Sequence, residues 1–213
     1  MRTRRRFALT VAALALSLYV SVSAAAHRLD EYLQAARVSL LVNAVVVELN
    51  LTPGVAVAPS VVAAIDGDRD GRFSDVEQQT YADRLRSDLH LAIDGVALPA
   101  ELTRIEYPTL EQLTDGVGVI RIELRSTFST STAGHHEFSL RNDHRPEVGV
   151  YLANALVPMT AAIAIRDQRR DLDQRELRIE YDVTPGGTSP IVFIVAALVA
   201  LVGLAGILRF RRA

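Results

Sequence analysis

Hydrophobic and polar residues alternate along several segments of this chain, with the period of two that a half-buried β-strand requires. The alternation is clearest in residues 45–51, 120–124 and 177–183, where every second residue is Val, Leu, Ile or Tyr. Further candidate strands are residues 32–42, 89–93, 96–98, 135–141, 148–156 and 161–166. About eight strands separated by turn residues predict a mostly β domain, an antiparallel β-sandwich for which an immunoglobulin-like arrangement is one form.

The pattern changes to a helical one between about residues 59 and 89. Pro59 suits the first turn of a short entering helix, and Ser74 or Asp75 suits the N-cap of a second helix. The apolar face of the entering helix would consist of Val61, Val62 and Ile65. The apolar face of the second helix would consist of Val76, Ala82, Leu85 and Leu89. We therefore expect a helix-loop-helix segment inserted between two strands.

The residues between these two helices, 66–77, read D-G-D-R-D-G-R-F-S-D-V-E. A 12-residue Ca²⁺ loop takes side-chain oxygens at positions 1, 3, 5 and usually 9, a backbone carbonyl at 7 and a bidentate carboxylate at 12. Those positions hold Asp66, Asp68, Asp70, Ser74, Arg72 and Glu77, in the order 1, 3, 5, 9, 7 and 12. Gly71 stands at position 6, where the sharp turn favours a residue that tolerates positive φ. The alternative interpretation is an acidic solvated turn.

Residue by residue, this loop resembles the EF-hand family, and the resemblance implies Ca²⁺ as the bound ion. EF-hands normally pair, but the sequence shows no second loop. Residues 167–176 are acidic and lack a turn glycine, and Asp94-Gly95 lies between alternating apolar residues as in a hairpin turn. An unpaired loop favours a structural site over a calmodulin-like switch.

Both ends of the chain carry patterns typical of export and membrane anchoring. Residues 1–26 combine arginines, an apolar run and small residues, as in a signal peptide that would leave His27 as the N-terminus. An uncleaved anchor is the alternative. Residues 191–208 are long and apolar enough for a transmembrane helix, and the basic tail 209–213 would be cytoplasmic. We expect a single-pass protein whose domain 27–183 is extracytoplasmic, periplasmic or at the cell surface, and joined by linker 184–190. Alternatively, residues 186–213 form a sorting signal that is removed.

Charge is distributed unevenly between these regions. All 25 acidic residues fall between residues 27 and 183, whereas 7 of the 23 arginines belong to the two ends, which leaves 16 arginines and a formal charge of −9 for the domain. An acidic surface disfavours nucleic acid and anionic lipid as partners and is compatible with cations. The absence of cysteine excludes disulfides. The partners we expect are therefore Ca²⁺, the membrane through the C-terminal helix, and a protein that the sequence does not identify.

Motifs for catalysis are missing: the sequence has no nucleophile elbow, P-loop or dinucleotide fingerprint, so we expect no enzyme. Residues 27–35, 51–57 and 151–158 resemble exported bacterial EF-hand proteins with one C-terminal transmembrane helix, and are distantly similar to extracytoplasmic domains of metal-transport accessory proteins. We expect a Ca²⁺-binding interaction module. The alternative is an accessory protein for transition-metal handling that uses histidines near His27 or His135, with the loop as a brace.

Overall fold

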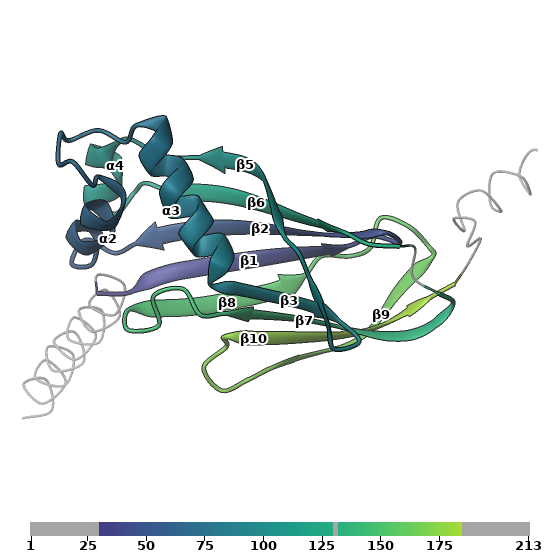
Figure 1. Ribbon diagram of the computed structural model, residues 1–213. Helices are drawn as coiled ribbons and strands as arrows, with labels where there is room; N and C mark the ends of the chain where they lie inside the picture. Colours follow the sequence, from purple (N-terminus) through teal and green to yellow (C-terminus); the bar gives the residue numbers. More distant parts are fainter. Residues whose placement is uncertain (1–29, 130–131, 185–213) are drawn as a thin grey trace, which may run out of the picture.

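The structure is a computed structural model that describes residues 30–129 and 132–184 (Figure 1). The predicted signal peptide, transmembrane helix and basic tail lie outside these residues, as does all of the linker after residue 184. No helix within the described ranges is both long and apolar enough to cross a membrane.

Ten strands form two five-stranded sheets in the described part of the chain. The first sheet has the order β5-β6-β2-β1-β8, and the second has the order β4-β3-β7-β10-β9. The first contains β1 (Tyr32–Leu40), β2 (Ala44–Pro53), β5 (Glu101–Glu106), β6 (Ile120–Thr127) and β8 (Gly149–Ala155). The second contains β3 (Leu89–Ile93), β4 (Val96–Leu98), β7 (Gly134–Asn142), β9 (Ile163–Arg170) and β10 (Glu176–Val183). The predicted mostly β fold with two antiparallel-rich sheets is confirmed.

One strand pair departs from the antiparallel prediction. Strands β1 and β8 are parallel neighbours, with Tyr32 opposite Gly149 and Val38 opposite Ala155. A hairpin forces its two strands to be antiparallel, but β8 reaches β1 after the chain has passed through the second sheet. No local turn therefore sets its direction, and the expectation of a purely antiparallel fold was wrong at this pair.

The core lies between the two sheets and is built by the alternation seen in the sequence. In β2, Val45, Val47, Leu49 and Leu51 are buried, while the residues between them are less so. Strands β6 and β10 contribute in the same way, and all three join one hydrophobic cluster. Each such side chain contributes about 1.5–3 kcal/mol through burial.

Helices α2 (Ala58–Ile65) and α3 (Asp75–Ser87) connect β2 of the first sheet to β3 of the second. Pro59 lies in the first turn of α2, as predicted, and Ser74 rather than Asp75 is the N-cap of α3. The buried face of α3 consists of Tyr81, Ala82 and Leu85.

Val76 is 75% exposed, so its predicted place on the apolar face of the helix was wrong. It lies nine residues from Leu85. At about 100° per residue this separation is half a turn, which puts the two side chains on opposite faces of the helix.

Three further local features complete the fold. The turn at Asp94 and Gly95, with φ of 51° and 77°, joins β3 to β4 as the hairpin pattern predicted. The sequence patterns did not predict β5, because its exposure does not alternate. They also missed helix α4 (Leu110–Thr114), which is only 5 residues long.

Candidate functional site

The acidic loop runs from the end of α2 to the first turn of α3. Asp66 is the residue that caps α2, and its carboxylate accepts hydrogen bonds from the N–H groups of Asp70 and Gly71, both at 3.1 Å. Asp68 also accepts from Asp70 at 3.1 Å. Gly71 has φ of +81°, the left-handed conformation that its position in the loop was predicted to need. Hydrogen bonds between aspartate side chains and nearby backbone N–H groups, together with Gly71, thus fold the loop around its own aspartates.

Three carboxylates converge inside the loop. Asp66, Asp68 and Asp70 each offer one oxygen, and these oxygens lie within 4.8 Å of one another. Ca²⁺–oxygen distances are 2.3–2.6 Å, so two oxygens bound to one ion are at most roughly 5 Å apart. Asp66 is 6% exposed, whereas the other two are open to solvent. Three of the six predicted ligands are therefore at separations that one Ca²⁺ could bridge.

Glu77 lies at the edge of this group rather than within it. Its Oε2 accepts from the Ser74 hydroxyl at 2.7 Å and from the Ser74 N–H at 3.0 Å, in a capping box, while Oε1 accepts from the Gly67 N–H at 2.7 Å. The hydroxyl hydrogen bond from Ser74 is the main cause that lowers the Glu77 pKa. Oε1 also accepts from the Asp68 N–H at 3.4 Å, so four hydrogen bonds meet the roughly four lone-pair sites of this carboxylate, and an ion bound by Glu77 would have to replace some of them.

The remaining predicted ligand, Arg72, is placed by its backbone: its N–H donates to Asp70 at 2.8 Å. The coordination roles of all six residues stay predictions. Phe73 anchors the loop, because its ring packs edge-to-face with the ring of Tyr107 at a centroid distance of 6.1 Å. The Tyr107 hydroxyl in turn donates to the Gln78 carbonyl at 3.1 Å. The loop is thereby fastened to the segment after β5.

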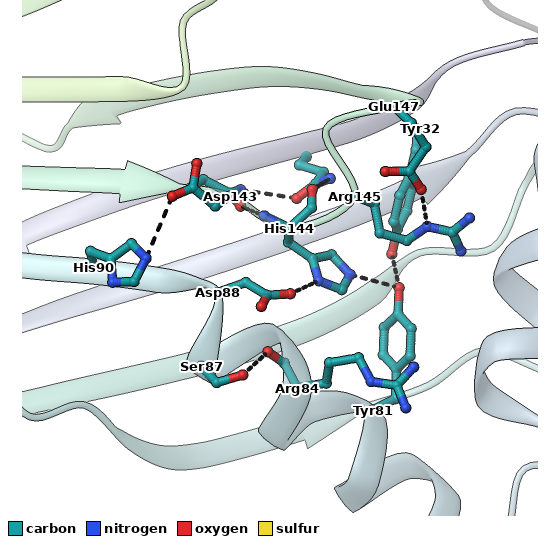
Figure 2. Close-up of polar contacts among 12 residues, drawn as sticks. Tyr32, Tyr81, Arg84, Ser87, Asp88, His90, Asp143, His144, Arg145 and Glu147 are labelled. Carbon is teal, nitrogen blue, oxygen red and sulfur yellow. Dashed lines mark hydrogen bonds and ion pairs between the residues drawn. The ribbon is translucent and has the colours of Figure 1, made fainter.

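The other end of α3 enters a buried chain of hydrogen bonds (Figure 2). Asp88 Oδ2 lies 2.7 Å from His144 Nδ1, His144 Nε2 lies 3.0 Å from the Tyr81 hydroxyl, and that hydroxyl lies 2.9 Å from the hydroxyl of Tyr32. An ionised carboxylate only accepts, so His144 donates through Nδ1, and in the neutral imidazole the other nitrogen, Nε2, accepts from Tyr81. Tyr81 then accepts from Tyr32, and the direction of every bond in the chain is set.

Burial keeps this chain uncharged beyond Asp88. It lowers the pKa of His144, raises the pKa of Tyr81 to about 12, and raises the pKa of Tyr32 well above its ordinary value. Polar groups on three strands complete the cluster around His144. The Gln34 amide and the Tyr151 hydroxyl both donate to the His144 carbonyl at 2.8 Å, and Asn142 donates to Gln34 at 2.9 Å. We call Asp88, His144, Tyr81 and Tyr32 the relay.

Sequence reasoning missed the relay. One signal was available: Gln34 is buried and has the same inward parity in β1 as Tyr32 and Ala36. A polar side chain at a core position needs a hydrogen-bond partner, which indicates a buried polar cluster but does not name its members.

A pocket of ≈ 380 Å³ lies beside the relay, between α2, α3 and the loop that follows β7. Its lining is formed by Ser60, Ala63, Ala64, Tyr81, Arg84, Asp88, His144 and Arg145. Arg145 is already engaged, since it donates to the carbonyl and hydroxyl of Ser60 at 3.1 Å each and to Glu147 at 3.0 Å. Tyr81, His144 and Asp88 are joined by hydrogen bonds in that order, so these lining residues stabilise the fold.

The other histidines of the described chain are dispersed. His90 faces Asp143 at 3.5 Å, and His135 faces Asp182 at 3.1 Å. His136 bonds to Asp94 at 2.7 Å, and this bond is the main cause that raises the His136 pKa. Within residues 30–129 and 132–184, the only group of three metal-ligating side chains is the one formed by Asp66, Asp68 and Asp70. His27 lies outside the described residues.

Comparison of the chain with protein-family models, with curated proteins and with solved structures finds no match. The case for a function therefore rests on the geometry of the site.

Proposed function

We propose that residues 66–77 bind one Ca²⁺ ion in the manner of an EF-hand, and that the protein is a membrane-tethered extracytoplasmic interaction module braced by this ion. The observation that carries the proposal is the convergence of Asp66, Asp68 and Asp70 within 4.8 Å, in a loop bounded by two helices. Gly71 has the positive φ that position 6 of such a loop favours.

A structural role is favoured over a switch because both helices are held at the core. Val61 and Ile65 of α2, and Tyr81 and Leu85 of α3, are buried. The relay also ties α3 to β1 and to the loop after β7. An opening of the two helices would expose these buried side chains to water. The free energy of Ca²⁺ binding at one exposed loop would have to offset the cost of that exposure. Extracellular sites of this kind commonly bind in the 10⁻⁴–10⁻³ M range, so the loop would remain filled outside the cell.

The sequence patterns at residues 1–26 and 191–208 support the proposed export of the domain and its tethering to the membrane. The acidic domain favours cations over nucleic acid as its ligand. A role in transition-metal handling would need His27 or a partner protein to supply ligands, because the other four histidines face separate carboxylates.

Calorimetric titration of the full chain in detergent micelles tests Ca²⁺ binding. We expect one site with a Kd of about 10⁻⁴–10⁻³ M. Asp68→Asn removes a ligand charge and keeps the oxygen that accepts from Asp70, so we expect a loss of about tenfold or more. Glu77→Gln keeps the capping box and should weaken binding as well. Asp173→Asn is the matched control, because Asp173 is exposed and lies in the β9–β10 turn, outside the loop.

Absence of saturable Ca²⁺ heat in the unmodified chain at millimolar concentration would overturn the proposal. Saturable binding of Zn²⁺, Cu²⁺ or Ni²⁺ that survives Asp68→Asn would instead support the transition-metal alternative.

A further inference from the structure

Three loops at one end of the described domain contain no charged residue, although Asp94 of the nearby β3–β4 turn is bonded to His136, which also contacts the Thr132 carbonyl. These loops are residues 41–43 between β1 and β2, 128–133 between β6 and β7, and 156–162 between β8 and β9. We call their described residues the neutral end. The rest of the surface differs, since the domain carries 25 acidic residues, many of them in loops such as 66–75 and 171–175. Figure 1 shows the neutral end on the side where β1 and β10 finish, opposite α2 and α4.

Backbone hydrogen bonds place these loops together and beside the point where the chain leaves the domain. Phe128 donates to the Asn43 carbonyl at 3.1 Å, which joins the first two loops. The third loop begins with Leu156, which donates to Val38 at 2.8 Å, and it ends at Ala162, which accepts from Thr184 at 2.8 Å. The exit of the chain is therefore one hydrogen bond away from the loop of residues 156–162.

That loop displays apolar side chains to the outside. Leu156, Val157 and Met159 are 36%, 88% and 96% exposed. Single exposed apolar residues are ordinary in proteins, but three within four positions, in a loop without charge, form a local apolar surface. No described residue covers Val157 or Met159.

We propose that the neutral end rests on the lipid bilayer, with Val157 and Met159 in the interfacial region. This inference depends on the proposed tether by residues 191–208. The 7 residues from Thr184 to Ile191 can span at most about 25 Å, so the tether holds the end of β10 close to the membrane. Anionic lipid repels an acidic surface, whereas an uncharged face can approach it and bury apolar side chains.

The docking direction also determines where the Ca²⁺ loop lies. Since α2 and the start of α3 are at the opposite end of the two sheets (Figure 1), the loop of residues 66–77 would point away from the bilayer. Partners and ions would reach it from the aqueous side, and the membrane would not cover it.

Tryptophan fluorescence of the full chain in vesicles tests this orientation, because the protein has no native tryptophan. The M159W variant would be reconstituted in phosphatidylcholine vesicles with and without brominated acyl chains. We expect its emission at shorter wavelength than in water, with most of its intensity lost to the brominated lipid. The matched control is L172W: Leu172 is fully exposed in the β9–β10 turn at the other end of β10, so its emission should be that of a solvated indole and be quenched by acrylamide.

Co-sedimentation with the vesicles separates the two claims. Emission of M159W identical to that of L172W, in chain that sediments with vesicles, would overturn the docking surface and leave the tether intact. Short-wavelength emission that brominated lipid does not quench would show a protein occupant, such as a second copy, and would also overturn it. Chain that stays in the supernatant would refute the tether, and the docking surface would fall with it.

Discussion

The direction of the hydrogen bonds in the relay predicts that its two tyrosines are unequal, although both are buried. Tyr32 and Tyr81 are 0% and 1% exposed, and their hydroxyls are 2.9 Å apart. Tyr81 stands in the middle, where it donates to His144 and accepts from Tyr32, whereas Tyr32 stands at the end. Substitution of either tyrosine by phenylalanine removes one oxygen from the same cluster. The two substitutions differ in how many buried polar groups they leave without a hydrogen-bond partner.

Tyr81→Phe leaves two buried groups without a partner, the His144 Nε2 and the Tyr32 hydroxyl. Each such group costs about 1–3 kcal/mol, so the free energy of unfolding should fall by about 2–6 kcal/mol. Tyr32→Phe leaves only a spare lone pair on Tyr81, which still donates to His144. We expect a loss of about 0.5–1.5 kcal/mol for that variant, the usual net value of one hydrogen bond.

The double variant gives the sharper test. Once Tyr81 is phenylalanine, the Tyr32 hydroxyl is an unpaired buried donor, so its removal should cost nothing or restore stability. The free energies come from urea unfolding of the full chain in micelles, followed by the near-ultraviolet circular dichroism of the tyrosines. Equal losses for the two single variants, or losses that add in the double variant, would refute the assigned direction of the relay.

Two further predictions concern the Ca²⁺ loop and the histidines. Gly71→Ala should lower the free energy of unfolding by about 1–2 kcal/mol, since φ is +81° and no atom lies within 4 Å of the added Cβ, so backbone strain is the only cost. Gly67→Ala, whose Cβ would meet Glu77 Oε1 at an ordinary 3.8 Å, should change it little, and equal effects of the two would contradict the argument. By NMR, His144 should titrate below 6.5 and His136 above it, because burial lowers the first pKa and the Asp94 hydrogen bond raises the second. The contribution of His144 to the free energy of unfolding should accordingly decrease as the pH drops from 6.5 towards the folded-state pKa of His144. The contribution of His136 should decrease as the pH rises from 6.5 through the folded-state pKa of His136. The reverse order of titration would contradict both assignments.

Local signals predicted most of the strands and the helix-loop-helix segment. Alternation in β2, β6 and β10 reflects burial of one face, and that physical cause acts on each strand separately. Ser74 is the N-cap, one of the two residues predicted for that position, because capping involves only neighbouring residues. Strand β5 lacks alternation and α4 is a single short turn, so neither had a periodic signal to find.

The sequence by itself determined the alternating strands, the two helices and the order of acidic residues in the loop of residues 66–77, because each depends on residues close together in the chain. Tertiary structure decided three other features: the parallel pairing of β1 with β8, the relay that joins Tyr32 to Asp88 through His144 and Tyr81, and the gathering of three uncharged loops beside Thr184. The contacts that form them join residues tens of positions or more apart in sequence, and only the packing of two sheets and a helix brings those residues together.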